Sequence, residues 1–356
     1  MKKLVVLLLT VVLAIAFTAC GGSGSSGGGS AAGGDESAGI ASMGDVTWTY
    51  AHTGRNGDEL DQYAELLKKY MEEAFPNVTL ELSNAAKLGT DPERMELVHE
   101  DGVEFAQFSS LEFGVAVPAA DALGIAYILP QDPEKLSYVV TEGSAVNYIN
   151  SILEEQGYIA MDWYPESYTC ITSNKELTPD MSCLKGQKIR AMNTSIDVAN
   201  VKGLGASPQA LDYGEIYTGL QLGTVDGQMN PLPIIEANKF YEVQKYILLS
   251  YHECVLDVTC VSPALWASFT DDDKAKMKEV FLKVNKEAVA NRTANNEKSL
   301  KAIQEGNPDI KIVDMTDEQR AEWAKTAGNE AKKQYLENAG KEEGQKVLDM
   351  LEADGQ

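Results

Sequence analysis

The chain has 356 residues, of which 44% are hydrophobic and 24% are charged, and its formal net charge is −24. A single hydrophobic core stops growing at roughly 250–300 residues, so two lobes are expected. The acidic excess argues against binding to nucleic acid or anionic lipid, both of which attract clustered Lys and Arg. The only long apolar run lies at the start, which excludes a protein with several membrane spans.

Residues 1–19 are typical of a secretion signal. Lys2 and Lys3 precede an apolar run over 4–17, which is shorter than the ~20 residues that cross a bilayer. The run ends in FTAC, which resembles a bacterial lipobox with Phe17 where Leu is usual. This resemblance implies that residues 1–19 are removed and that Cys20 is lipidated. The alternative is an ordinary signal peptide followed by an unmodified Cys.

Residues 20–45 are rich in Gly and Ser and predict a flexible tether, because few of their side chains can offset the entropy of ordering. A tether of this length spans roughly 25–30 Å root-mean-square. The expected location is therefore extracytoplasmic, with the protein lipid-anchored to the outer face of the cell membrane or in a periplasm. Contact with the membrane is expected through the lipid alone.

From Val46 the pattern alternates between strands and helices. Apolar residues at a period of two predict strands over 46–52, 77–83 and 102–108, and a period near 3.6 predicts helices over 58–75 and 91–100. This βαβαβ beginning predicts a mostly parallel sheet.

The remaining elements continue the α/β pattern. The predicted helices are 132–155, 195–204, 214–222 and 270–306, and the predicted strands are 157–163, 168–174, 187–192, 224–230, 245–253 and 255–263. Strand-like connections near 163–169 and 253–257 are the expected crossings between lobes. The run 270–306 is either one helix that leans on both lobes or two helices that the pattern does not separate. Thr270 with Asp273, and Thr316 with Gln319, predict helix N-caps.

Motifs that carry catalysis or cofactor chemistry are absent from the sequence. There is no GxSxG, HExxH, Walker loop or Cys/His cluster, so no enzyme activity, cofactor or metal is expected. The segment GLGASP fails the dinucleotide pattern because Pro208 stands at the third Gly position, and it predicts a turn. Cys170, Cys183, Cys254 and Cys260 are expected to be buried thiols or to include a structural disulfide.

Residues 184–251 carry the most informative motifs. They contain LKGQKIRAMNT, then LGASPQALDYGEIYTGLQLGTVDGQMNP, then FYEVQKYILLSYH. In this order and spacing they resemble the DctP-type solute receptors of TRAP transporters (tripartite, ATP-independent periplasmic). A weaker similarity extends through 85–110, so the resemblance covers most of the chain from Val46.

The resemblance implies an α/β, two-lobed periplasmic-binding-protein-like fold with hinge strands and a long helix bracing both lobes. The expected first lobe is 46–166 plus 255–294, and the expected second lobe is 167–254 plus 295–356. Such a receptor would bind a small organic acid between its lobes and deliver it to the small and large membrane subunits of the carrier. Binding would favour the closed form because the ligand contacts both walls.

The resemblance also implies ligand-binding residues. Arg190 stands where the family places the Arg that pairs with the ligand carboxylate, and a guanidinium matches a carboxylate with two parallel hydrogen bonds. The alternative for Arg190 is a structural ion pair. Tyr213 stands at the aromatic residue that packs on the ligand, and Asn230 at the amide that hydrogen-bonds its carboxylate. Asn193, next to the same motif, is included in the predicted site.

Four further residues complete the predicted site. A looser alignment places Ser109 and Trp163 in the cavity wall, although Trp163 could equally belong to the core. His52 closes the first strand, where ligand contacts often occur. Thr169 stands where many relatives carry a second Arg, which favours a monocarboxylate with an apolar or hydroxylated tail over a dicarboxylate or sugar acid.

Three other functions remain open at this point. A receptor for an ABC importer shares the two-lobed plan, although the KIR and DGQMNP motifs argue against it. A ligand sensor module would touch a signalling partner. A secreted hydrolase or lyase would need a catalytic residue set that the sequence does not show.

Overall fold

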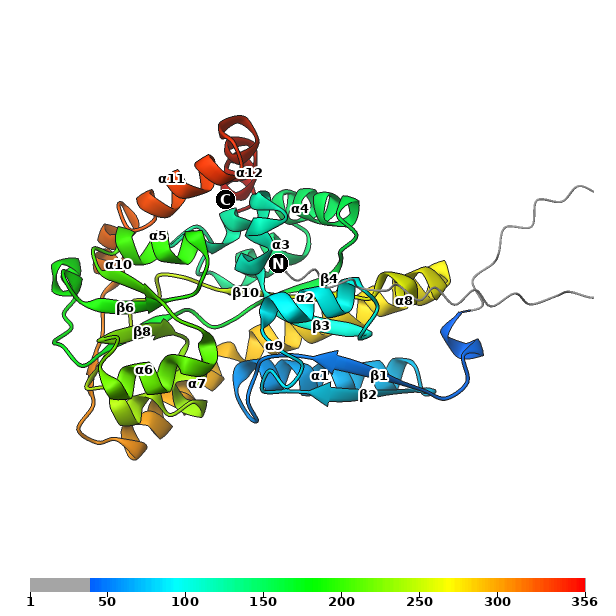
Figure 1. Cartoon of the computed structure of the whole chain (residues 1–356), viewed down its shortest axis with the longest axis horizontal. Helices are drawn as coiled ribbons and strands as arrows, with labels where there is room; N and C mark the ends of the chain where they lie inside the picture. Colours follow the sequence, from blue (N-terminus) through cyan, green and yellow to red (C-terminus); the bar gives the residue numbers. More distant parts are fainter. Residues whose placement is uncertain (1–38, 356) are drawn as a thin grey trace, which may run out of the picture. The chain divides into compact units, whose positions relative to one another are not determined.

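Two mixed β-sheets organise residues 39–355, the part of the chain that the computed structural model describes (Figure 1). The predicted signal peptide, Cys20 and most of the predicted tether lie outside these residues. The first sheet has the strand order β2-β1-β3-β10-β4. Its strands are β1 (Val46–Ala51), β2 (Val78–Ser83), β3 (Phe105–Ser109), β4 (Ile159–Pro165) and β10 (Leu256–Val261).

The predicted parallel beginning of this sheet is confirmed. β1 pairs in parallel with β2 and β3, and helices α1 (Glu59–Ala74) and α2 (Asp91–His99) form the crossovers. α1 buries Leu60, Tyr63 and Leu67, as its helical periodicity predicts. β10 then joins β3 and β4 in antiparallel pairing.

The second sheet has the order β11-β9-β5-β8-β6-β7. Its strands are β5 (Cys170–Ser173), β6 (Lys188–Ala191), β7 (Ser207–Ala210), β8 (Gly227–Asn230), β9 (Tyr246–Leu248) and β11 (Lys311–Val313). The sequence did not predict the edge strands β7 and β11. The expected turn in GLGASP is present, with Gly205 at φ +82, and it leads directly into β7.

One predicted helix is two helices. The pattern over 132–155 separates into α3 (Pro133–Thr141) and α4 (Ser144–Glu155), with Gly143 between them in an extended conformation. A Cβ at Gly143 would stand 2.4 Å from the carbonyl oxygen of Val139. The bend therefore needs glycine at this position, which the apolar periodicity could not show.

The predicted long helix is continuous. α9 (Asp271–Gly306) has 36 residues and begins with the predicted capping box of Thr270 and Asp273. At 1.5 Å per residue it extends about 54 Å. It packs on α1, α3 and β4, and also on α7 (Leu232–Ala237), which follows a strand of the second sheet. The interpretation as one helix bracing both sheets is therefore correct. No helix within the described residues is long and apolar enough to span a membrane.

The chain crosses between the sheets where the sequence predicts. It leaves β4 after Pro165, enters β5 at Cys170, and returns between Leu248 and Leu256. The two connections hydrogen-bond to each other, because the N–H of Glu166 donates to the carbonyl of Val255 at 3.0 Å and the N–H of Thr169 to the carbonyl of Glu253 at 2.8 Å.

The remaining helices cover the two sheets. They are α5 (Ser195–Gly203), α6 (Ile216–Leu222), α8 (Pro263–Ser268), α10 (Asp317–Ala324), α11 (Asn329–Asn338) and α12 (Lys341–Gly355). α11 packs on α5, whereas α12 packs on α3 and α4, beside the first sheet (Figure 1). Residues 39–355 belong to one compact unit, so the predicted lobe boundaries remain a prediction.

The cysteines of the body are free thiols. Cys170, Cys254 and Cys260 are buried and Cys183 is partly buried, with no disulfide among them. Burial raises the pKa of Cys170, Cys254 and Cys260, which disfavours the reactive thiolate. Of the two expectations for these residues, the structure supports buried thiols.

Candidate functional site

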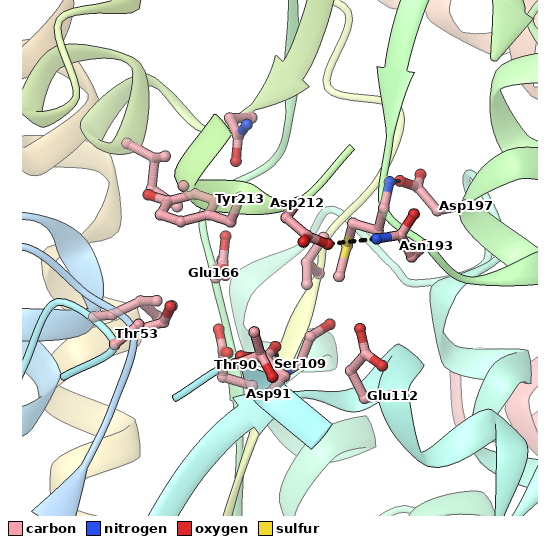
Figure 2. A pocket seen from close by; sticks show the side chains of 18 of the residues that line it. Thr53, Thr90, Asp91, Ser109, Glu112, Glu166, Asn193, Asp197, Asp212 and Tyr213 are labelled. Carbon is pink, nitrogen blue, oxygen red and sulfur yellow. Dashed lines mark hydrogen bonds between the residues drawn. The ribbon is translucent and has the colours of Figure 1, made fainter. Parts of the chain in front are cut away.

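A cavity of about 440 Å³ is lined by residues from both sheets and from the two connections between them (Figure 2). Thr53 and Ser109 lie at the carboxyl ends of β1 and β3, and Arg190 and Asn230 lie in β6 and β8. Ligands of open α/β sheets bind at this end of the strands. The cavity is therefore the leading candidate for a ligand site.

Six of the eight residues predicted to bind ligand line this cavity. They are Ser109, Thr169, Arg190, Asn193, Tyr213 and Asn230. His52 and Trp163 are not among its lining residues. The structure thus brings together side chains that are up to about 120 residues apart in the sequence.

Arg190 presents an unpaired charge to the cavity. The side chain is 6% exposed, and its Nε donates to the carbonyl of Leu211 at 2.9 Å. Within residues 39–355, neither of its Nη atoms makes a hydrogen bond or an ion pair, so the alternative of a structural ion pair is not realised there. Burial lowers the pKa of Arg190, while the nearby Asp197 acts in the opposite direction. An anionic group entering the cavity would satisfy the two Nη atoms.

Tyr213, Asn230 and Asn193 surround the Arg190 side of the cavity. The Tyr213 hydroxyl accepts a hydrogen bond from Asn238 at 2.8 Å, which fixes the phenol ring at the cavity wall. The Asn230 amide donates to Gln228, and Asn193 donates to Asp212, as Figure 2 shows for the second pair. These hydrogen bonds orient the Asn230 and Asn193 side chains through their amide N–H groups and do not involve their side-chain carbonyl oxygens.

Ser109 of β3 is held by an ion pair on α2. Its backbone N–H donates to Asp91 at 3.0 Å, and Asp91 is paired with Arg94. Arg94 is fully buried and also donates to the carbonyls of Gln107 and Gly89. This cluster fixes the edge of the cavity formed by α2 and β3.

His52 lies outside the cavity wall. The side chain is fully buried, its ring centroid is 5.6 Å from that of Tyr50, and burial lowers the pKa of His52 to about 4. Successive side chains of a strand point to opposite faces. The residue after it, Thr53, lines the cavity instead.

Trp163 belongs to the core, the second of the two readings its position allowed. It is 2% exposed, packs near Phe113 and donates from its indole nitrogen to Asn150 at 2.8 Å. It lines a different cavity, beside α4 and α9. Thr169 does line the ligand cavity, but its hydroxyl donates to the carbonyl of Glu253 at 3.2 Å, within the paired connections.

Comparison with known proteins identifies the family. The model of the family described as "DctP: Bacterial extracellular solute-binding protein, family 7" matches residues 50–338. The chain belongs to this family.

Two curated relatives are ectoine receptors by name. The chain is 26% identical over 308 residues to the ectoine-binding periplasmic protein TeaA of Halomonas elongata, covering 86% of this chain and 89% of TeaA. It is 28% identical over 321 residues to the ectoine/5-hydroxyectoine-binding periplasmic protein UehA of Ruegeria pomeroyi, covering 89% and 93%.

A solved structure shows the same fold. A TRAP periplasmic solute-binding protein from Desulfovibrio salexigens, with bound orotic acid, superimposes with a TM-score of 0.80 at 26% identity. The match covers 87% of this chain and 98% of the solved chain. The two-sheet α/β architecture is therefore that of a TRAP periplasmic binding protein, as predicted.

The cavity of this family 7 protein is also lined by several residues that the sequence analysis did not predict. Arg55, in the loop after β1, is a second guanidinium in its wall, and Glu112, Glu166 and Asp257 are carboxyl groups in its wall. Glu166 and Asp257 lie on the predicted crossings between lobes. Charged residues in otherwise buried connecting segments are unusual, and this signal could have marked them as candidates.

The cavity as a whole is acidic. Seven Asp and Glu side chains line it, against the two guanidinium groups of Arg55 and Arg190. Burial raises the pKa of Glu112 to about 7, and raises the pKa of Glu253 and Glu166 above their usual range. In a family 7 receptor, so many carboxyl groups would not strengthen the binding of a simple anion, because like charges repel.

Proposed function

We propose that this protein is the extracytoplasmic receptor of a TRAP transporter and that it binds a small organic acid without catalysing a reaction on it. The observation that carries this proposal is the buried guanidinium of Arg190, whose two Nη atoms have no partner within residues 39–355. A buried pair of charged donors is costly unless an anion completes it. A carboxylate has two oxygens at the spacing that these donors require.

The relatives support the same function. TeaA and UehA are named as ectoine-binding periplasmic proteins, and the Desulfovibrio salexigens TRAP protein holds orotic acid. Asn230 and Asn193 would add hydrogen bonds to the ligand from the Arg190 side, and Tyr213 would pack on it. Ser109 would contact it from the first sheet. Small and large membrane subunits of a TRAP carrier would then receive the ligand.

A ligand screen followed by an uptake assay tests this function. The purified protein is expected to melt at a higher temperature with at least one small carboxylic acid from a panel that includes ectoine, orotate and succinate. Native mass spectrometry should show one unaltered molecule of that acid per chain. Uptake of the same acid by cells that carry the neighbouring transporter genes should require an ion gradient. Uptake driven by ATP would favour an ABC importer, and conversion of the acid would indicate an enzyme.

We also propose that Cys20 carries a lipid anchor, on the basis of the FTAC sequence and the Gly/Ser-rich segment that follows it. Cys20→Ser is expected to move the protein from the membrane fraction to the soluble extracytoplasmic fraction. Fractionation of the expressing cells followed by immunoblotting measures this change. Cys183→Ser, which leaves the lipobox intact, is the control, and a Cys20→Ser protein that stays with the membranes would contradict lipidation.

A further inference from the structure

Two carboxyl groups line the cavity where the chain crosses between the sheets. Glu166 follows β4 and Asp257 lies in β10, and the two side chains are 6% and 3% exposed. The Glu166 carboxyl donates a hydrogen bond to the Asp257 carboxylate. Figure 2 shows the Glu166 side chain between Tyr213 and the residues of the first sheet. We call Glu166 and Asp257 the acidic pair.

The acidic pair lacks the donors that four of the five other acids of the cavity wall have. Within residues 39–355, no backbone N–H and no other side chain donates a hydrogen bond to either carboxyl group of the pair. Four other acidic residues of the wall each receive at least one such bond. These are Asp91 from Ser109, Asp197 from Met192, Asp212 from Asn193 and Glu253 from Asn200. Two buried carboxyl groups that satisfy only each other are costly unless a cation joins them.

The groups that face the acidic pair do not supply this cation. The charged neighbours are Glu59 of α1, and Asp91 and Arg94 of α2, with the Cys254 thiol nearby. The guanidinium of Arg292 in α9 lies beside Glu59 and Cys254. Arg94 already binds Asp91 and two backbone carbonyls. Glu59 accepts hydrogen bonds from Tyr164 and Ser167. Within residues 39–355, neither Arg94 nor Arg292 forms an ion pair with Glu166 or Asp257, so the pair has no cation of its own.

The cavity thus presents two unsatisfied groups of opposite charge, the Arg190 guanidinium and the acidic pair. Building on the proposed function, we infer that the ligand is a zwitterion, whose carboxylate pairs with Arg190 and whose ammonium or amidinium group donates hydrogen bonds to Glu166 and Asp257. A quaternary ammonium is disfavoured, because it has no N–H to donate and Tyr213 is the only aromatic residue in the wall.

Binding of such a ligand should displace a proton. Burial raises the pKa of Glu166 well above its usual value and that of Asp257 to about 7, so the empty pair keeps a proton at neutral pH. A ligand cation takes the place of this proton between the two carboxylates. Calorimetry in two buffers of different ionisation enthalpy measures the proton that is released.

Matched probes test the inference. Proline, 4-aminobutyrate and 4-(aminomethyl)benzoate are zwitterions with different separations between cation and carboxylate. Cyclopentanecarboxylate, pentanoate and 4-ethylbenzoate are their counterparts with carbon in place of the charged nitrogen. Proline betaine and 4-(trimethylammonio)butyrate are the quaternary controls. At least one zwitterion is expected to bind about tenfold or more tightly than its carbon counterpart, with proton release at pH 7. Proline and 4-aminobutyrate should also bind more tightly than their quaternary analogues if either is that zwitterion.

Two variants locate the effect. Glu166→Gln, and Glu166→Gln combined with Asp257→Asn, are expected to lose this preference and the proton release while still binding the matched acids through Arg190. Both replacements remove unfavourable buried charge, so the proteins should fold, which circular dichroism checks. Glu81→Gln, on an exposed position of β2, is the matched control and should behave as the wild type.

The outcomes separate this inference from the proposed function. If the matched acids bind as tightly as the zwitterions, or if only the acids bind, the ligand cation is refuted while the carboxylate receptor stands. A preference that survives in both variants also overturns the role of the acidic pair. If neither class of probe binds while an acid of the wider panel does, the inference fails and the carboxylate receptor stands. If no acid of either panel binds, both fail.

Discussion

Arg190→Ala is expected to weaken binding of the organic acid by about 10- to 150-fold, which corresponds to roughly 1.5–3 kcal/mol for charge-assisted hydrogen bonds. The reason is that the two Nη atoms have no partner within residues 39–355 and are free to bind the ligand carboxylate. The side chain contributes one hydrogen bond to the fold, from Nε to Leu211, so the variant should remain folded. Isothermal titration calorimetry measures the change in affinity.

Two further substitutions serve as controls for Arg190. Arg190→Lys keeps the charge but loses the planar pair of donors, so its affinity should fall between those of the wild type and Arg190→Ala. Lys188→Ala removes an exposed cation from the same strand, two residues away, and should leave the affinity unchanged. Unchanged affinity in Arg190→Ala would show that the carboxylate does not bind at this strand.

Asp162→Ala is expected to lower the free energy of unfolding by about 2–5 kcal/mol without changing ligand affinity. Asp162 is buried in β4 and accepts hydrogen bonds from Tyr63 of α1 at 2.6 Å and from Asn285 of α9 at 2.8 Å. Removing the carboxyl group leaves the Tyr63 hydroxyl buried without this acceptor and leaves the Asn285 amide with the carbonyl of Trp163 alone, at 3.2 Å. The same substitution removes one of the two hydrogen bonds by which Asn285 joins the long helix to β4. Urea denaturation at constant pH measures the loss.

The Asp162 result can be checked against two gentler changes. Asp162→Asn keeps one acceptor oxygen and should lose less stability than Asp162→Ala. Asp45→Ala, at an exposed position, should change the free energy of unfolding by less than about 0.5 kcal/mol. A stable Asp162→Ala protein would mean that Tyr63 and Asn285 find other partners in the core. Weaker ligand binding would mean that this cluster acts on the cavity.

Much of the fold could be predicted from the sequence because its elements are amphipathic and begin or end at recognisable capping and turn residues. Thr270 and Asp273 mark the start of α9, and the apolar residues of α1 follow a helical period. The edge strands β7 and β11 were missed because none of their side chains is fully buried, so they lack the apolar alternation that marks a strand. Gly143 divides a continuous helical pattern through a steric contact with Val139, which depends on the three-dimensional path of the chain.

The lining of the candidate cavity was predictable on the side of the second sheet, where the motif around Arg190 and Asn230 is dense. The first sheet gave weaker signals, and His52 shows why. A residue at a strand end is easy to identify, but whether its side chain faces the cavity or the core depends on a one-residue change in strand register. Glu166 and Asp257 are 91 positions apart by number, so only the paired connections reveal that they meet.

The hydrogen bonds between those two connections affect how the molecule can deform. Two strands bonded edge to edge form a ribbon, which flexes across its flat face far more easily than within its own plane. The link from Glu166 to Val255 and the link from Thr169 to Glu253 make such a ribbon. Opening and closing of the cavity would then be essentially a rotation about one hinge axis. The residues of the ribbon would move least during this rotation.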